Sequence, residues 1–265
     1  MNTKLEKIIV IKLGGSTFAS KDTSIEDIVK LQKDGYNLIL VHGGANVTTR
    51  WMAKLGLDTR FVNGERVTDL TTLEIVTAVL GGLVNKEIVA AIIAAGGQAV
   101  GLSGVDGGIL QGKMKSKEMG YMGNVAKVNP EPLFALLKAG IMPVVSPISL
   151  HSVDRPEGAP LLLNINGDPA AGAIACAVKA EKLIFLTDVA GIKDEKGQLL
   201  KHISPDEAEE LLSSGVASGG MVPKINACLK AISGGAKTCI IDGTKHHMLI
   251  KEVEGEGGGT AIEAD

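Results

Sequence analysis

Short apolar runs alternate along the chain with longer segments whose apolar residues recur every three or four positions. The short runs are typical of strands buried on both faces, as in parallel sheets, and the longer spacing is typical of helices. Their alternation predicts an α/β fold with a parallel sheet. The predicted strands cover 8–13, 37–41, 99–103, 142–147 and 237–242, with a strand and loop at 182–191. The predicted helices cover 24–34, 47–55, 71–95, 130–139, 169–178 and 204–215, and a last helix ends near residue 233.

Two stretches depart from this alternation. The segment 61–69 predicts a hairpin around Asn63-Gly64, and residues 107–124 predict a β-hairpin or a flexible flap. Arg66 follows the first turn, where it could bind a carboxylate through its guanidinium fork or lie on a solvated surface. The kinds of residue in the segments change near residue 178, although the alternation of strands and helices continues. This change predicts two units, 1–178 and 179–265.

Three sites along the sequence carry a glycine pair, two of them together with a lysine. They are Lys12 with Gly14-Gly15, the pair Gly43-Gly44, and Gly219-Gly220 with Lys224. Glycines leave backbone N–H groups open to an anion, and a lysine at a strand end requires a negative partner. Parallel strands place such loops on one sheet edge, where open α/β folds bind ligands. For Lys12 alone, an exposed side chain beside an ordinary tight turn explains the pattern equally well.

Composition excludes several classes of protein. The 265 residues carry a formal net charge of −3, which argues against nucleic acid as the main partner. We find no secretory signal and no apolar run long enough to span a bilayer, so we expect a cytoplasmic protein without a membrane partner. The three cysteines show no metal-ligand spacing, and we predict no protein metal site.

The familiar nucleotide and hydrolase motifs are absent from the sequence. It contains no P-loop, no dinucleotide fingerprint, no protein-kinase signature and no Ser-His-Asp signature. What remains is a crevice with Lys12, Lys224, backbone donors and the acidic Asp168. Phosphoryl transfer needs positioning and positive charge on the transferring oxygens, which these groups supply.

Six motifs occur in an order that resembles the amino-acid kinase superfamily, and most closely the acetylglutamate kinases. The resemblance covers essentially the whole chain and implies a three-layer αβα sandwich with a central, mostly parallel sheet. The motifs are Ile9-Val-Ile-Lys-Leu-Gly-Gly-Ser16, Val41-His-Gly-Gly44, Phe61-Val-Asn-Gly-Glu-Arg-Val-Thr68, Asn164-Ile-Asn-Gly-Asp168, Leu186-Thr-Asp-Val-Ala-Gly191 and Gly219-Gly-Met-Val-Pro-Lys224.

The resemblance implies a role for each matching residue. Lys12 and Lys224 would stabilise the transferring phosphoryl group, and Asp168 would orient both lysines. Arg66 would bind the α-carboxylate of the substrate, and Asn164 its acetamido group. The backbone donors to phosphoryl and carboxylate oxygens would be Gly14, Gly15, Gly44 and Ala45. The adenine-nucleotide contacts would be Asp188, Val189, Ala190, Gly191, Ile192, Lys193, Val216, Ala217 and Ser218.

The implied reaction is ATP-dependent phosphorylation of the γ-carboxylate of N-acetyl-L-glutamate for arginine biosynthesis. Mg²⁺ would sit on the ATP phosphates, largely through water. The resemblance also implies a homodimer with its interface on the helix 71–95. Because the first strand begins by Ile8, without room for the extra N-terminal helix of arginine-inhibited members, we expect arginine insensitivity. A nitrogen-signalling partner stays an open question.

The sequence departs from the family pattern at Ala45-Asn46, where the family usually has glycine and proline. Alanine keeps its backbone N–H, so the departure bears on the acyl substrate more than on the chemistry. One alternative is therefore a kinase for a carrier-protein-linked aminoadipate or glutamate. Another, of a different class, is a nucleotide-sensing regulatory protein without turnover, although such a sensor would not need Lys12, Asp168 and Lys224 together.

Overall fold

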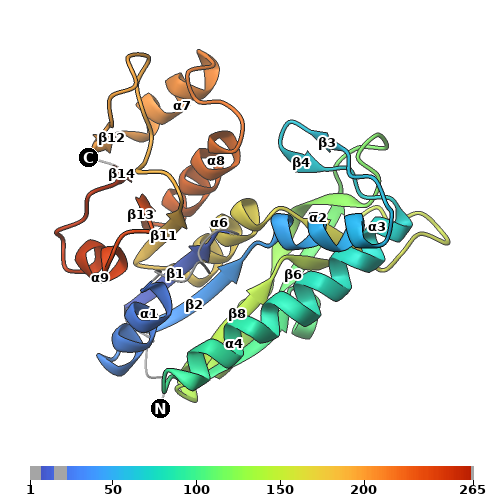
Figure 1. The fold of residues 1–265 in the computed structure, drawn as a ribbon, viewed down its shortest axis with the longest axis horizontal. Coiled ribbons are helices and arrows are strands. Elements are labelled where there is room, and N and C mark those ends of the chain that lie inside the picture. Colours follow the sequence, from blue (N-terminus) through green and yellow to red (C-terminus); the bar gives the residue numbers. More distant parts are fainter. Residues whose placement is uncertain (1–6, 15–22, 264–265) are drawn as a thin grey trace.

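The computed structural model of the protein describes residues 7–14 and 23–263. Its centre is a twisted sheet of eight strands, of which only the pair β13–β14 is antiparallel within the described part of the chain (Figure 1). In spatial order the strands are β12 (His202–Ile203), β14 (Thr260–Ile262), β13 (Lys237–Asp242), β11 (Lys182–Thr187), β1 (Ile8–Leu13), β2 (Asn37–His42), β8 (Met142–Ser146) and β5 (Ala99–Ser103).

Helices cover both faces of this sheet, which confirms the predicted three-layer α/β fold. Two buried hydrophobic clusters separate the layers. One face carries α5 (Glu131–Lys138), α6 (Gly167–Val178), α7 (Pro205–Ser213) and α8 (Met221–Ile232). The other carries α1 (Ser24–Lys33), α3 (Leu70–Val76), the π-helical segment η1 (Thr77–Val84), α4 (Asn85–Ala94) and α9 (Met248–Val253).

The alternation of side chains along each strand determines on which face of the sheet a functional side chain lies. Along β1, Val10 packs in the α6 cluster while Ile9 and Ile11 pack in the opposite cluster. Because side chains alternate with a period of two, Lys12 projects from the α6 face. The same alternation along β2 places His42 on the face of the long helix.

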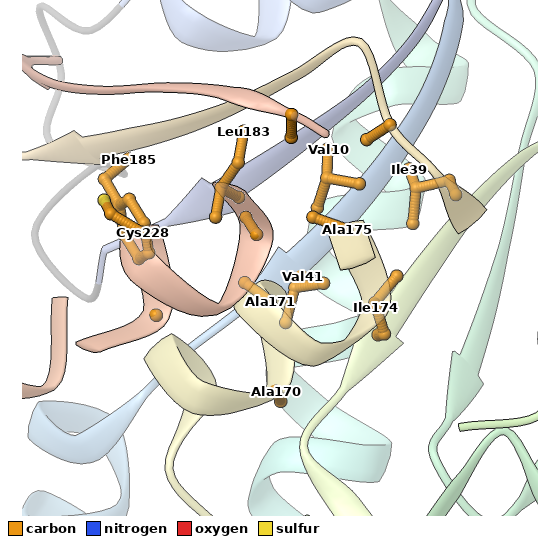
Figure 2. Packing of buried hydrophobic residues seen from close by; sticks show 14 of the residues in the cluster. Val10, Ile39, Val41, Ala170, Ala171, Ile174, Ala175, Leu183, Phe185 and Cys228 are labelled. Atoms are coloured by element: carbon orange, nitrogen blue, oxygen red, sulfur yellow. The ribbon is translucent and has the colours of Figure 1, made fainter. Parts of the chain in front are cut away.

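Small residues let α6 lie close to the sheet and to α8. Figure 2 shows Ala170, Ala171 and Ala175 of α6 packed beside Val10 and Val41 of the central strands. On the α8 side, a Cβ placed on Gly172 would lie 2.5 Å from the carbonyl oxygen of Ala227, so the two helices touch through their backbones. This contact fixes the separation of the two helices that carry Asp168 and Lys224.

A small closed barrel stands beside the main sheet. It contains β6 (Leu110–Met114), β7 (Met122–Val128), β9 (Ile148–His151) and β10 (Leu162–Ile165), next to the short helix η2 (Asp106–Gly108). The hairpin predicted within 107–124 is confirmed as β6–β7, whereas β9 was not predicted. The hairpin around Asn63-Gly64 is confirmed as β3 (Phe61–Val62) and β4 (Glu65–Arg66), and it projects from the body of the molecule (Figure 1).

Several helix boundaries differ from the prediction because capping residues were read as loop. The helix α6 begins at Gly167 with Asn166 as its N-cap. The helix α8 begins at Met221, so the predicted loop ending in Lys224 is wrong and Lys224 lies in the first helical turn. The helix α2 (Ala45–Lys54) likewise begins two residues earlier than predicted.

The long helix Leu70–Ala94 corrects one expectation. Its most apolar window has a mean hydropathy of 1.7, so this segment is long and apolar enough to cross a membrane, contrary to the expectation that no such run exists. Core helices of soluble proteins satisfy the same criterion, and 39% of that window is buried within the protein. Among the described residues it is the one helix with this property.

We predict that Gly172→Ala lowers the free energy of unfolding by about 1–3 kcal/mol, because the added methyl group pushes α6 away from α8. Chemical denaturation monitored by circular dichroism measures this loss. Gly258→Ala is the matched control, since a Cβ there would meet only Met248 Cε at an ordinary 3.5 Å. Equal stability of the two variants would contradict the close helix contact.

Candidate active site

A cavity of about 270 Å³ opens at the carboxyl ends of the central strands. The segments that follow β1, β2, β10 and β11 line it together with the β3–β4 hairpin. Gly14 and the pair Gly43-Gly44 therefore meet at the predicted sheet edge, and the third glycine loop contributes Lys224 alone. Of the predicted site residues, Lys12, Gly14, Gly44, Ala45, Arg66, Asn164, Asp188 and Lys224 line the cavity.

An ion cluster of three side chains forms the floor of this cavity. The Asp168 carboxylate, only 4% exposed, forms an ion pair with Lys12 Nζ at 2.5 Å through one oxygen and accepts a hydrogen bond from Lys224 Nζ at 3.0 Å on the other. Burial alone would raise the pKa of Asp168, but the two ammonium groups outweigh it and hold that pKa below its usual value. Asp168 therefore stays ionised and fixes two cations that face the cavity.

Three different elements deliver the members of this cluster. Lys12 ends β1, Asp168 lies in the first turn of α6, and Lys224 lies in the first turn of α8. The side chain of Asn166 caps α6 by accepting the Asp168 N–H at 3.0 Å, and Asn166 itself lines the cavity. Sequence reasoning missed Asn166, although an asparagine two residues before an Asp-Pro pair is a helix-start signal.

The glycine loop after β2 adds backbone donors at the cavity wall. Gly44 is the N-cap of α2, and the first N–H groups of a helix have no acceptor within it. Gly44 and Ala45 therefore bring donors to the cavity. Gly14 also lines the cavity, but its N–H donates to the Leu186 carbonyl at 3.0 Å, so an anion would compete with that bond. The predicted donor Gly15 lies outside the described residues.

Arg66 is a second kind of buried cation in the cavity lining. It is 6% exposed, and its guanidinium donates to the Ala45 carbonyl at 3.0 Å and to Thr49 Oγ1 at 2.7 Å while stacking 4.7 Å from the Phe61 ring. Burial lowers the pKa of Arg66. Within the described part of the chain no carboxylate forms an ion pair with it, and such a charge favours an anionic ligand. The surface alternative for Arg66 is therefore wrong.

Asn164 lies between the ion cluster and Arg66. Its Nδ2 donates to the fully buried Thr68 Oγ1 at 3.0 Å, and the Thr68 hydroxyl donates in turn to the Arg66 carbonyl at 2.9 Å. This chain fixes the orientation of the Asn164 amide, because Nδ2 must face the threonine. A ligand in the cavity meets an amide whose donor and acceptor ends are already assigned.

Glu65 is a cavity residue that sequence reasoning did not single out. It forms an ion pair with Lys115, which follows β6, and accepts Asn166 Nδ2 at 3.4 Å. The pair joins the projecting hairpin to the small barrel. No local sequence signal could have found it, because its partners lie 50 and 101 residues away.

The residues predicted to contact adenine nucleotide are only partly gathered at the cavity. Asp188 lines it, next to Thr187. Ile192 and Ala217 carry side chains that pack in the hydrophobic core, so they could contact a nucleotide through their backbone alone. Val189 is exposed on the loop after β11, and Ser218 is exposed just before α8. The nucleotide contacts therefore stay a prediction.

The arrangement can bind an anion that carries more than one charged group. Lys12, Lys224, the start of α2 and Arg66 all line the same cavity, and Arg66 lies beside the start of α2. Cations held by Asp168 need no rearrangement when charge develops on a bound group, which is the condition for electrostatic stabilisation of a transition state.

Comparisons with known proteins agree with this geometry. The sequence profile of the Amino acid kinase family matches residues 7–242. A protein from Dehalococcoides mccartyi strain CBDB1 named acetylglutamate kinase is 54% identical over 262 residues, covering 99% of this chain and 96% of that protein.

Two solved structures share the fold of this chain at lower sequence identity. N-acetylglutamate synthase from Neisseria gonorrhoeae, complexed with coenzyme A and N-acetyl-glutamate, superposes with a TM-score of 0.82 and 25% identity, over 98% of this chain and 60% of that one. Carbamate kinase from Giardia lamblia bound to AMP-PNP superposes with a TM-score of 0.69 over 98% of this chain and 99% of that one; at 17% identity this likeness shows the fold alone.

We predict that acid lowers the stability of the protein through His42, the residue before the Gly43-Gly44 loop. Burial lowers the pKa of His42 from 6.5 to about 4. Between these values the unfolded chain binds a proton that the native protein does not, so the free energy of unfolding falls by up to about 3 kcal/mol from pH 7 to pH 4.

Chemical denaturation across this pH range, with and without His42→Gln, measures the contribution. The variant should have a flatter pH dependence than the unsubstituted protein. Asp168 affects the stability at lower pH than His42 does. Its pKa is below its usual value of 3.8, so its contribution to the free energy of unfolding is lost only below that pH. Parallel curves for the two proteins between pH 7 and 4.5 would contradict the assignment.

Proposed function

The chain belongs to the amino acid kinase family, and from this membership we propose that it transfers the γ-phosphoryl group of ATP to the γ-carboxylate of N-acetyl-L-glutamate. The product is an acyl phosphate for arginine biosynthesis. The observation that carries the proposal is the Lys12–Asp168–Lys224 cluster on the floor of the cavity. Relatives named acetylglutamate kinase support the choice of acceptor.

Phosphoryl transfer between two oxygens needs in-line positioning and positive charge on the equatorial oxygens. Lys12 and Lys224 supply that charge from two sides. An ionised carboxylate is already a nucleophile, so the reaction requires no general base. Asp168 acts by holding both ammonium groups in place, which keeps the charges fixed while the phosphoryl group moves.

The cavity suits an acceptor with two carboxylates. The γ-carboxylate lies by Lys12 and the Gly44 and Ala45 donors, and the α-carboxylate pairs with Arg66, whose buried charge has no carboxylate partner in the described structure. The oriented amide of Asn164 meets the acetamido group. Hydrogen bonds to Ala45 and Thr49 use part of the Arg66 fork and hold the rest in position.

We assign the unit 1–178 to the amino acid and the unit 179–265 to ATP. The sheet runs through both units, because β1 pairs with β2 on one side and β11 on the other. The nucleotide contacts are Asp188 to Lys193 and Val216 to Ser218. Mg²⁺ would be held on the ATP phosphates, largely through water, as small hard cations prefer.

The active protein is a homodimer in the cytoplasm, with its interface on the long helix 71–95. Large apolar side chains lie exposed on this helix (Leu83 and Ile93), on the neighbouring α2 (Trp51) and at the residue that follows α2 (Leu55). Exposed groups of this kind favour burial against another chain.

The first experiment is an assay of ADP release with Mg-ATP and N-acetyl-L-glutamate, glutamate, aspartate or N-acetyl-aminoadipate, with hydroxylamine trapping the acyl phosphate. We expect turnover and a hydroxamate with N-acetyl-L-glutamate alone. Lys12→Met or Lys224→Met should lower kcat by about 10²–10³-fold, the usual cost of one transition-state donor.

Lys30→Met is the matched control, because Lys30 forms an exposed ion pair with Asp34 on α1. Near-normal turnover in either cluster variant would refute the role of the lysines. If the folded protein binds ATP but phosphorylates none of the free acids, a carrier-linked substrate is favoured. If it binds ATP and shows no turnover with any substrate, a sensor is favoured.

We also predict that Lys115→Met raises KM for N-acetyl-L-glutamate about fivefold with little change in kcat. The variant leaves the Glu65 carboxylate unbalanced beside a cavity that takes a dianion, a repulsion of about 1 kcal/mol. The double variant Glu65→Gln/Lys115→Met should recover the original KM. If the KM of the double variant is as high as that of Lys115→Met, the lysine acts in another way than by balancing the Glu65 charge.

A further inference from the structure

His42 occupies a position that the proposed chemistry does not use. It ends β2 and directly precedes Gly43-Gly44 at the cavity wall, yet its side chain is only 1% exposed and points to the face of the long helix. There it contacts Asn85, the fully buried first residue of α4. A buried histidine and a buried asparagine therefore connect the anion-binding loop to the long helix.

The hydrogen bonds allow one tautomer of His42. Its Nδ1 lies 2.8 Å from the Gly43 carbonyl oxygen, which can only accept, so Nδ1 carries the proton. Nε2 then has a lone pair and accepts from Asn85 Nδ2 at 3.2 Å. Burial lowers the pKa of His42 to about 4, so the ring stays neutral near pH 7.

The orientation of the Asn85 amide is equally determined. Its Nδ2 also donates to the carbonyl oxygens of Leu102 at 3.1 Å and Val144 at 2.9 Å, so its two hydrogens are shared among three acceptors, and its Oδ1 accepts from Lys86 Nζ at 2.9 Å. A reversed amide would set its oxygen against two carbonyl oxygens and its nitrogen against an ammonium group. The network thus determines which atoms donate and which accept along the whole chain of hydrogen bonds from Lys86 to Gly43.

We propose that His42 and Asn85 are positioning residues that set the Gly43–Gly44 peptide for the reaction. This inference rests on the proposed function, because it concerns the loop that meets the reacting carboxylate. A trans peptide is planar, so the Gly44 N–H points opposite to the Gly43 carbonyl that His42 holds. A rotated peptide would present a carbonyl oxygen where an anion needs a donor.

The packing of the loop supports the same conclusion. Gly44 has φ 149°, and a Cβ on it would lie 2.5 Å from Leu80 Cδ2 of η1. The loop therefore presses against the helix segment that immediately precedes Asn85. Glycine allows several peptide orientations at this point, and the His42 hydrogen bond selects one of them.

Two substitutions of His42 separate positioning from stability. Asn at position 42 keeps a donor for the Gly43 carbonyl but is too short to reach Asn85, whereas Gln reaches toward Asn85 and loses the Gly43 bond. We expect His42→Gln to lower kcat by about tenfold to a hundredfold with KM for ATP nearly unchanged. His42→Asn should recover most of that kcat. A merely structural histidine would give two variants with similar loss of stability and normal kcat per folded molecule.

Nitrogen NMR of the ¹⁵N-labelled protein tests the geometry without turnover. We expect the Nδ1–H tautomer of His42 at pH 7, a shifted Gly44 amide signal in His42→Gln, and partial loss of the single tautomer in Asn85→Leu. If Asn85→Leu fails to fold, the two His42 variants decide the matter. The Nε2–H tautomer, or an unmoved Gly44 signal, would overturn the inference.

The two proposals fail in different ways. Normal kcat in His42→Gln, with an active unsubstituted protein, overturns the positioning role and leaves the proposed function intact. An unsubstituted protein that phosphorylates none of the acids overturns the proposed function, while the ring tautomer and the Gly44 signal still decide whether His42 sets the loop.

Discussion

One buried carboxylate organises the site. Asp168 has almost no contact with water, and a buried charge persists only if it is paired. Its two partners come from β1 and α8, elements far apart in the sequence that α6 brings together. The small residues of α6 serve this arrangement, because a bulkier helix would move Asp168 away from at least one lysine. The ion cluster and the helix packing therefore depend on each other.

The other charges that line the cavity differ in how they are paired. Lys12 and Lys224 share Asp168, and Lys115 neutralises Glu65. Arg66 has only neutral acceptors within the described residues. Burying this guanidinium without a carboxylate partner is costly, and an anionic ligand in the cavity would offset that cost.

The sequence allowed the six longer strands of the sheet and most helices to be predicted, because runs buried on both faces and helical spacing are local signals, whereas the short edge strands β12 and β14 were not predicted. It also located Lys12 and Gly44 at one sheet edge, since that placement follows from parallel strands. The six motifs identified Asp168 as a partner of both lysines. Geometry that arises from distant segments was not accessible: the pair Glu65–Lys115, the strand β9 in the small barrel and the bond from the Gly14 N–H to Leu186 all depend on tertiary contacts.

The π-helical segment Thr77–Val84 has a consequence for how this chain can change during evolution. Its hydrogen bonds run from residue i to i+5, so each closed turn holds one residue more than an α-helical turn. Such a segment is equivalent to an insertion that the helix absorbed without breaking. Removing one residue from it would restore an ordinary helix and leave Asn85 facing His42 and Ile88 and Ile92 in the core, whereas the loss of a residue from α4 would rotate everything beyond it. The segment can therefore accept a change in length that the rest of the long helix cannot.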